Sequence, residues 1–149
     1  MPRRATRGLG ARYRRRSAKA ELFWNYEEAD MTGMSSTTTS GDMRSYVDTC
    51  LECYRACVST AQHCLDLGGK HAERSHITLL LDCGDICQAS AAFMLRASDH
   101  HGVVCGVCAD LCRHCATSCE SLGASDPVMQ QCAEICRHCE RSCRAMARM

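Results

Sequence analysis

Cysteine is the residue type most able to carry chemistry in this chain, because it supplies 15 of the 149 residues. The thiols recur at steps of three and four residues, with one step of seven, which places side chains on one face of an α-helix. Four such stripes are present: Cys50, Cys53, Cys57 and Cys64; Cys83 and Cys87; Cys105, Cys108, Cys112, Cys115 and Cys119; and Cys132, Cys136, Cys139 and Cys143. Each stripe therefore predicts a helix that turns one face of thiols toward its partner helices.

Pairs of thiols one helical turn apart indicate that this face binds a soft metal ion. Thiolate ligands select Cu(I), Zn²⁺ or iron–sulfur clusters. Structural zinc sites come as separate groups of four ligands, and continuous stripes are not divided in that way. Cu(I) accepts fewer sulfurs per ion, so the pattern favours several Cu(I) ions. Loading must then be coupled to deprotonation, because an unpaired thiolate is costly in a protein core.

Other uses of the same cysteines stay open. They are zinc sites, an iron–sulfur cluster, reversible thiol redox chemistry, and a structural bundle in which the thiols are inert small hydrophobes. A disulfide framework is disfavoured by the odd number of cysteines and by the lack of a secretory signal. The run that starts at Cys105 lacks the ferredoxin spacing. The C-x-x-C pairs lack the βαβ context of a thioredoxin motif.

Four helices must position these thiols, and we expect them at 43–67, 72–97, 103–122 and 127–147. Gly68-Gly69, the segment 98–102 and Ser121–Gly123 predict helix ends, and Asp126-Pro127 predicts a helix start. Short connections favour antiparallel neighbours, so the predicted fold is all-α, an antiparallel up-down-up-down four-helix bundle with a cysteine-lined core. Outside the cysteines, the core-facing stripes continue at Met43, Tyr46, Thr60, Leu67, His76, Leu80, Ser90, Met94, Ala97, Met129 and Met146.

Residues 1–41 differ from the rest of the chain. Eight basic residues and no acid lie between positions 3 and 19, and a Ser/Thr/Gly run follows at 31–41. We expect a basic, disordered N-terminal extension with a flexible linker over 1–41, followed by a metal-storage bundle over 42–149. A translation start at Met31 or Met34 is the alternative, and contact of the arginines with nucleic acid or an acidic surface is a third. No apolar stretch follows the arginines, so we expect no export signal and a cytoplasmic location.

Composition narrows the function further. Leu, Ile, Val and Phe together supply only 22 of 149 residues, so cysteine must replace aliphatic residues in the core. A net charge of +1 gives no reason to expect a nucleic-acid partner. No run of about 18 apolar residues exists, so we expect no membrane span. Sequestration of metal, rather than catalysis, is the function that these features favour.

An internal repeat carries a family resemblance. The segment CADLCRHCATSC, which begins at Cys108, matches CAEICRHCERSC, which begins at Cys132. These cysteine-striped helices resemble the four-helix-bundle copper storage proteins, in particular their cytosolic branch. The resemblance implies a core that binds many Cu(I) ions and a homo-oligomer, a tetramer; storage in turn suggests exchange with a copper chaperone or a cuproenzyme. The second helix has only two cysteines and Thr60 interrupts the first stripe, so we expect a somewhat smaller capacity.

The two ends of such a bundle differ in their side chains. One end collects softer or imidazole donors that could hand Cu(I) inward: Met43, Met94, His100, His101 and Met146. The opposite end is expected to form an apolar plug of Leu67, Leu80, Leu122 and Met129. His76 lies on the core-facing stripe and is a further candidate ligand, whereas His63, His114 and His138 are expected at the surface or an interface. Gap-filling methionines and exposed loop histidines are the alternative.

Overall fold

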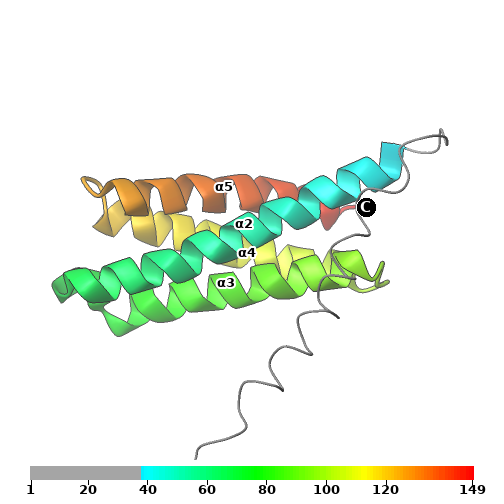
Figure 1. Cartoon of the computed structure of the whole chain (residues 1–149). Helices are drawn as coiled ribbons and strands as arrows, with labels where there is room; N and C mark the ends of the chain where they lie inside the picture. Colours follow the sequence, from blue (N-terminus) through cyan, green and yellow to red (C-terminus); the bar gives the residue numbers. More distant parts are fainter. Residues whose placement is uncertain (1–37) are drawn as a thin grey trace, which may run out of the picture. The chain divides into compact units, whose positions relative to one another are not determined.

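The computed structural model describes the backbone of residues 38–149 and the side chains from residue 43 onward. Four long helices lie side by side (Figure 1): α2 (Thr38–Leu67), α3 (Arg74–Leu95), α4 (His101–Leu122) and α5 (Pro127–Met146). A short 3₁₀ turn, η2 (Gly69–Ala72), connects α2 to α3. The described residues contain no strand. The expectations for residues 1–37 lie outside the described part of the chain.

The helices form the predicted bundle. Both α2 and α4 pack against α3 and α5, so each helix has two principal neighbours. Successive helices run in opposite directions along the bundle (Figure 1). The prediction of an all-α four-helix bundle is therefore confirmed. Helix α2 begins at Thr38, five residues before its expected start, because the end of the Ser/Thr-rich segment is helical.

Local chemistry explains where two of the helices begin and end. Helix α2 ends where Gly68 and Gly69 take φ values of 70° and 58°, a left-handed conformation that glycine adopts without steric cost. Helix α5 begins as predicted at Pro127. The carboxylate of Asp126 accepts hydrogen bonds from the backbone N–H groups of Val128 and Met129, at 2.9 and 3.1 Å, which satisfies two N–H groups that the helix itself cannot pair.

Helix α3 ends earlier than predicted. Ala97 takes a φ of 50°, so the chain leaves the helix after Leu95, and Ala97 is exposed rather than on the core-facing stripe. The N–H of Ser98 bonds to the Phe93 carbonyl at 3.0 Å, and the N–H of Ala97 bonds to the Met94 carbonyl, also at 3.0 Å. This pattern is a Schellman motif, which glycine usually closes. Because Ala97 stands in its place, the sequence did not predict this helix end.

Cysteine fills most of the core, as the composition predicted. All fifteen cysteines are buried, and among the described residues Val47 and Leu80 are the only buried branched aliphatic side chains. Small alanines fill the spaces between the thiols. Of the expected apolar plug, Leu80 and Met129 are buried and Leu122 is half-buried, but Leu67 is 50% exposed. Leu67 was wrongly placed in the core because the helix ends there, one residue before Gly68.

One described helix, α3, is long and apolar enough to cross a membrane by length and composition, with a mean hydropathy of 1.3. The sequence did not predict such a segment, because Asp82 and Asp85 interrupt the apolar run. The core helix of a bundle passes the same test. Here Leu80, Cys83 and Cys87 of α3 are completely buried in the bundle, so core packing explains the hydropathy of this helix.

Candidate metal centre

The thiols of the four helices meet in one continuous column along the bundle axis. Each cysteine side chain is at most 2% exposed. Sulfur atoms of different helices approach closely: the Cys50 and Cys143 Sγ atoms lie 3.5 Å apart, as do those of Cys87 and Cys108. These distances exceed the ~2.05 Å of a disulfide bond, and all fifteen cysteines are free thiols. The column is therefore a dense set of soft ligands.

Within the column, sulfurs gather in groups of four whose atoms all lie within 4.8 Å of one another. The four groups are Cys50, Cys108, Cys139 and Cys143; Cys53, Cys87, Cys112 and Cys139; Cys53, Cys57, Cys83 and Cys136; and Cys57, Cys115, Cys132 and Cys136. Each group shares at least one sulfur with the next. Shared thiolates suit a chain of bridged Cu(I) ions better than separate tetrahedral sites.

The sharing limits what zinc could do here. Any three of the four quartets include two with a common sulfur, so at most two quartets of the described chain can be occupied at once by separate tetrahedral ions. The quartets leave out Cys64, Cys105 and Cys119. Metal ions that are bridged by shared sulfurs are not restricted to two quartets. The expected numbers of bound zinc and copper ions therefore differ widely.

His76 is the predicted imidazole that the structure brings to a thiol. Its side chain is buried, and its Nε2 atom lies 3.6 Å from the Cys64 Sγ atom. Its other nitrogen, Nδ1, lies 2.8 Å from the Ser118 hydroxyl. Burial lowers the pKa of His76, which favours the neutral ring whose lone pair can bind a metal. The serine holds the ring in the orientation that points Nε2 at Cys64.

The other predicted auxiliary residues occupy different environments. Met94 and Met146 are buried in the core, and Met43 packs half-buried against it. His100 is exposed. His101 is half-buried, and its Nδ1 atom lies 2.6 Å from the backbone carbonyl of Ser98. Within residues 43–149, neither of these two imidazoles contacts a thiol.

A second histidine, which the sequence did not predict as a candidate ligand, lies near the opposite end of the bundle. The Nδ1 atom of His71, in η2, lies 3.1 Å from the Met129 Sδ atom. It therefore adds an imidazole and a thioether at the end of the bundle that also holds Cys64 and His76. Helical periodicity could not identify His71, because it lies in a connection. The signal available was its place in a short turn five residues before His76.

Another surface histidine ties two helices together. His63 on α2 was expected at the surface, and it is half-buried, with its Nε2 atom 2.8 Å from an Asp126 carboxylate oxygen. The hydrogen bond from His63 lowers the pKa of Asp126, as do the bonds from the backbone N–H groups of α5. This pair fixes the start of α5 beside the last turns of α2, next to Cys64.

Hydrogen bonds between thiols raise the pKa of some cysteines in the column and lower the pKa of others. The thiol of Cys112 bonds to its neighbours and lowers the pKa of Cys53, Cys83 and Cys108. Cys112 in turn holds its own proton, because its contact with Cys108 raises its pKa. Farther along, burial and the nearby Asp126 carboxylate raise the pKa of Cys64. Complete deprotonation therefore requires cations within the column.

Comparison with known proteins decides the family. A family model described as copper storage protein matches residues 39–148. The chain belongs to the copper storage protein family. The match spans nearly the whole described bundle and confirms the resemblance seen in the cysteine repeats.

Individual proteins are also similar to this chain. A curated cysteine-rich protein of Bacillus subtilis, YhjQ, is 33% identical over 73 residues, which cover 49% of this chain and 68% of YhjQ. The crystal structure of the Nmul_A1745 protein from Nitrosospira multiformis is 44% identical, with a TM-score of 0.68, and the match covers 73% of this chain and 97% of that one.

Two further solved structures are copper storage proteins by name. The Cu(I)-bound copper storage protein BsCsp3 is 30% identical, with a TM-score of 0.66 over 71% of this chain and 98% of its own. The apo form of copper storage protein 3 from Bacillus subtilis is 31% identical, with a TM-score of 0.63 over 70% and 97% of the two chains. The described bundle therefore matches almost the entire length of these proteins.

Proposed function

We propose that the protein stores several Cu(I) ions on the thiolates that line the core of its bundle. The observation that carries this proposal is the series of four sulfur quartets that share members. Membership of the copper storage family and the likeness to Cu(I)-bound BsCsp3 support it. The proposed ligands are all fifteen cysteines.

Storage works by exchange of protons for metal. Each Cu(I) that enters replaces thiol protons, so that its charge compensates the thiolates within the core. Sulfurs that belong to two quartets, such as Cys53 and Cys139, bridge neighbouring ions. The thiols are at most 2% exposed, so the ions are shielded from bulk water. Sequestration of this kind needs no catalytic group, and we propose that the protein is not an enzyme.

Auxiliary ligands at both ends complete the proposal. His76 is the strongest of them, because it lies 3.6 Å from the Cys64 sulfur. At the opposite end we propose Met43, Met94 and Met146 as thioether ligands and His100 and His101 as outer donors, since Met94 and Met146 are buried there. Softer or imidazole donors beside a thiolate column form a gradient from weaker to stronger binding.

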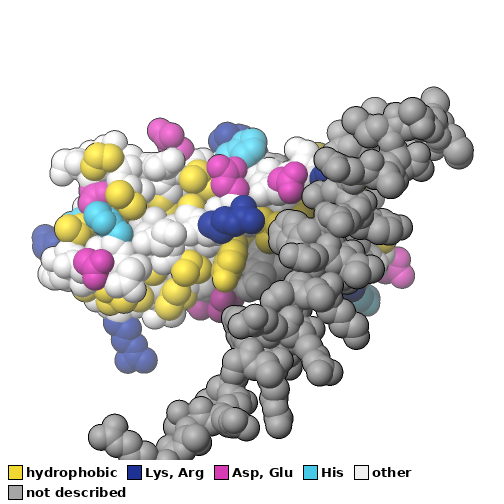
Figure 2. Space-filling view, viewed as in Figure 1, with side chains coloured by type: hydrophobic (Ala, Val, Ile, Leu, Met, Phe, Trp, Pro, Cys, Tyr) yellow, Lys and Arg dark blue, Asp and Glu magenta, His cyan; other side chains and the backbone are white. Residues whose placement is uncertain are grey.

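We also propose a homotetramer in the cytoplasm that exchanges copper with a chaperone or a cuproenzyme. Free thiols persist in a reducing compartment. Several apolar side chains are exposed on α2 and α3, where Figure 2 shows hydrophobic groups gathered on one face. They include Val58, Leu65 and Leu81, at 39%, 51% and 42% exposure. Exposed apolar patches commonly mark protein contacts. Light scattering of the purified chain measures the oligomeric state.

The test is an anaerobic titration of the reduced protein with Cu(I) against a chromophoric chelator. We expect retention of roughly one ion per cysteine. A parallel titration with zinc should saturate at no more than two tetrahedral quartets. Retention of only a few Cu(I) ions, with the remainder taken by the chelator, would contradict storage and leave zinc as the metal that the quartets favour.

A further inference from the structure

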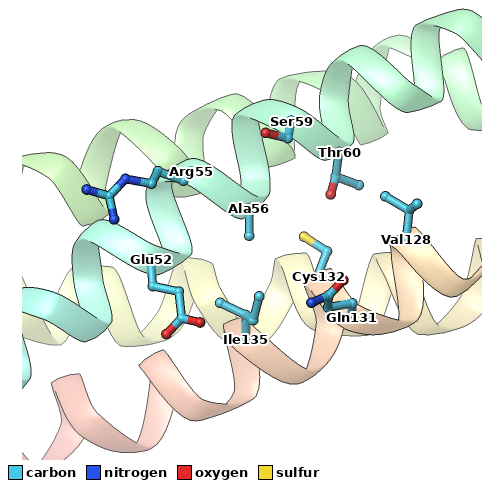
Figure 3. Close-up of a pocket in the computed structure, with 9 residues that line it drawn as sticks. All are labelled: Glu52, Arg55, Ala56, Ser59, Thr60, Val128, Gln131, Cys132 and Ile135. Carbon is cyan, nitrogen blue, oxygen red and sulfur yellow. The ribbon is translucent and has the colours of Figure 1, made fainter.

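A groove runs between α2 and α5 and reaches the sulfur column from the side (Figure 3). It encloses about 280 Å³. Ala56, Ser59 and Thr60 line it from α2, and Cys132 and Ile135 line it from α5. The Cys132 sulfur points across the groove toward α2 (Figure 3). A thiol of the metal centre therefore forms part of its wall.

Side-chain size explains why the groove exists at this place. Ala56, Ser59 and Thr60 are small, so α2 leaves space opposite α5. Thr60 also occupies the position on the core-facing stripe where a cysteine would continue the column. A second groove, between α4 and α5, encloses about 410 Å³ and is lined by residues such as Glu120, Ala133 and Arg137, with no cysteine among them. Of these two grooves, the one between α2 and α5 leads to a thiol.

Cys132 is connected to the rest of the column. It belongs to the quartet with Cys57, Cys115 and Cys136, and this quartet shares Cys57 and Cys136 with the next one. A Cu(I) ion received by Cys132 is thus already within bridging distance of two quartets.

The rim of the groove is charged. Glu52 and Arg55 border it on α2, and neither forms an ion pair with another described residue. A molecule with both a carboxylate and an amine complements these two groups. The volume of about 280 Å³ lies just below the ~300–1,000 Å³ typical of small-molecule pockets. It therefore fits a small molecule and excludes a folded protein domain.

We propose that this groove is a lateral port at which a small amino-acid or peptide thiol that carries Cu(I) exchanges its ion with Cys132. The inference rests on the proposed storage of Cu(I). It adds a route into the column that bypasses both ends of the bundle. The occupant is a low-molecular-weight thiol rather than a protein chaperone.

The exchange is a ligand substitution. The Cys132 thiolate attacks the Cu(I) ion of the incoming complex and forms one Cu–S bond, and one bond between copper and the carrier sulfur breaks. The carrier leaves as a thiolate and takes up the proton that Cys132 has lost. Copper stays in the +1 state, so no electron donor or acceptor is needed. Removal of copper is the reverse sequence.

Filling the groove tests the port. Ala56→Leu and, as a second variant, Ser59→Leu place a larger side chain in the groove without changing a cysteine. Glu134→Leu places the same side chain in the groove between α4 and α5, at an exposed position. Stopped-flow loading is followed with two donors: the Cu(I) complex of cysteine, which is small, and that of bathocuproine disulfonate, which is too bulky for the groove.

We expect both groove variants to slow loading from Cu(I)–cysteine by about tenfold, with wild-type copper capacity at equilibrium. Glu134→Leu should load like the wild type, and loading from the bulky complex should be unchanged in every variant. Wild-type rates in both groove variants, at full capacity, would overturn the port but leave storage intact. A wild-type protein that fails to retain copper would overturn the proposed function and the port together.

A copper-free measurement checks access to Cys132 directly. Brief treatment of the apo protein with iodoacetamide, followed by peptide mass spectrometry, should modify Cys132 before Cys136, the next thiol of its stripe. Ala56→Leu should slow the modification of Cys132 and leave that of Cys143 unchanged, because Cys143 does not line the groove. Equal rates at Cys132 in the wild type and in Ala56→Leu would overturn the port independently of any metal.

Discussion

At the scale of single residues, two polar side chains interrupt the column of thiols. Thr60 and Ser90 are 2% and 0% exposed and occupy positions where a cysteine would continue a stripe. The hydroxyl of Ser90 is buried without a hydrogen-bond partner in the described part of the chain. An unsatisfied buried hydroxyl destabilises the folded state. Ser90 therefore costs stability and removes one potential ligand.

Replacement of Ser90 should improve both properties. We expect Ser90→Cys to raise the free energy of unfolding of the apo protein by about 1 kcal/mol and to raise the copper capacity by about one ion, since it adds a thiol to the column. Ser90→Ala is the control, because it removes the hydroxyl without adding a ligand: it should gain the stability alone. Equal copper capacity in the two variants would show that position 90 does not contribute to metal binding.

Among individual residues, the sequence predicted the thiols well and the histidines poorly. One residue type repeated at steps of three and four identifies a helix face even when the helix ends are uncertain, so all fifteen cysteines were placed in the core. His76 was found in the same way. His71 was missed because its approach to Met129 depends on the path of a connection, and no periodicity describes that path.

At the scale of the helices, the residues in the connections determine how well each helix end is capped. Ala97 ends α3 with a φ of 50°, a conformation that costs an L-residue about 1–2 kcal/mol. Nothing in the sequence marked this end, because the residue that usually takes this conformation is glycine. The predicted helix therefore continued along the core-facing stripe to Ala97, beyond the observed end of α3. The boundaries marked by Gly68 and by Asp126-Pro127 were predicted correctly.

Glycine at position 97 should relieve this cost. We expect Ala97→Gly to raise the free energy of unfolding by about 1 kcal/mol. Ala92→Gly is the matched control in the same helix: Ala92 is also exposed, but it lies in regular helix, where glycine costs about 0.5–1 kcal/mol. Chemical denaturation of both variants measures the two changes. Destabilisation by Ala97→Gly as large as that by Ala92→Gly would contradict the motif.

Close packing at the turn between α4 and α5 gives a second test at this scale. A Cβ atom at Gly123 would collide with the Met129 Cβ atom and lie 2.8 Å from its sulfur. We expect Gly123→Ala to cost about 1–3 kcal/mol and to disturb the contact between Met129 and His71. At Gly106 the nearest atom to an added Cβ is the Ala147 Cβ atom at 3.9 Å, so Gly106→Ala should be neutral or stabilising in thermal melts.

At the scale of the whole molecule, the core is lined by thiols that can bind copper and contains few hydrocarbon side chains. The four stripes predicted that thiols face one another, but not which sulfurs form quartets, because that depends on how far each helix is shifted along its neighbours. The groove beside Cys132 depends likewise on the match of small α2 residues with α5. The sequence identifies Thr60 as a break in the stripe. Its effect on access to Cys132 depends on the position of α5 opposite α2, which the sequence does not show.

The protons of the column make the stability of the apo protein depend on pH. The pKa of Cys64 is raised by burial, and that of Cys105 is raised by Cys143 and by burial. Groups with a raised pKa in the folded state contribute stability that is complete below their unfolded pKa of about 8.5 and is lost as the pH rises through the folded value. The pKa is lowered for Cys53, Cys83, Cys108 and Cys132 and raised for the other eleven cysteines. The raised values outnumber the lowered ones, so the apo protein should become less stable as the pH rises above about 8.5.

Copper should abolish this dependence. In the loaded protein the thiols have already exchanged their protons for Cu(I), so few protons remain to be lost on the alkaline side. We expect the melting temperature of the apo protein to fall as the pH rises above about 8.5, and that of the loaded protein to stay nearly constant. Parallel thermal melts under anaerobic conditions measure both. If the melting temperature of the apo protein were as insensitive to alkaline pH as that of the loaded protein, burial of the thiols would not depend on their protons. The proposed coupling of copper uptake to proton release would then be wrong.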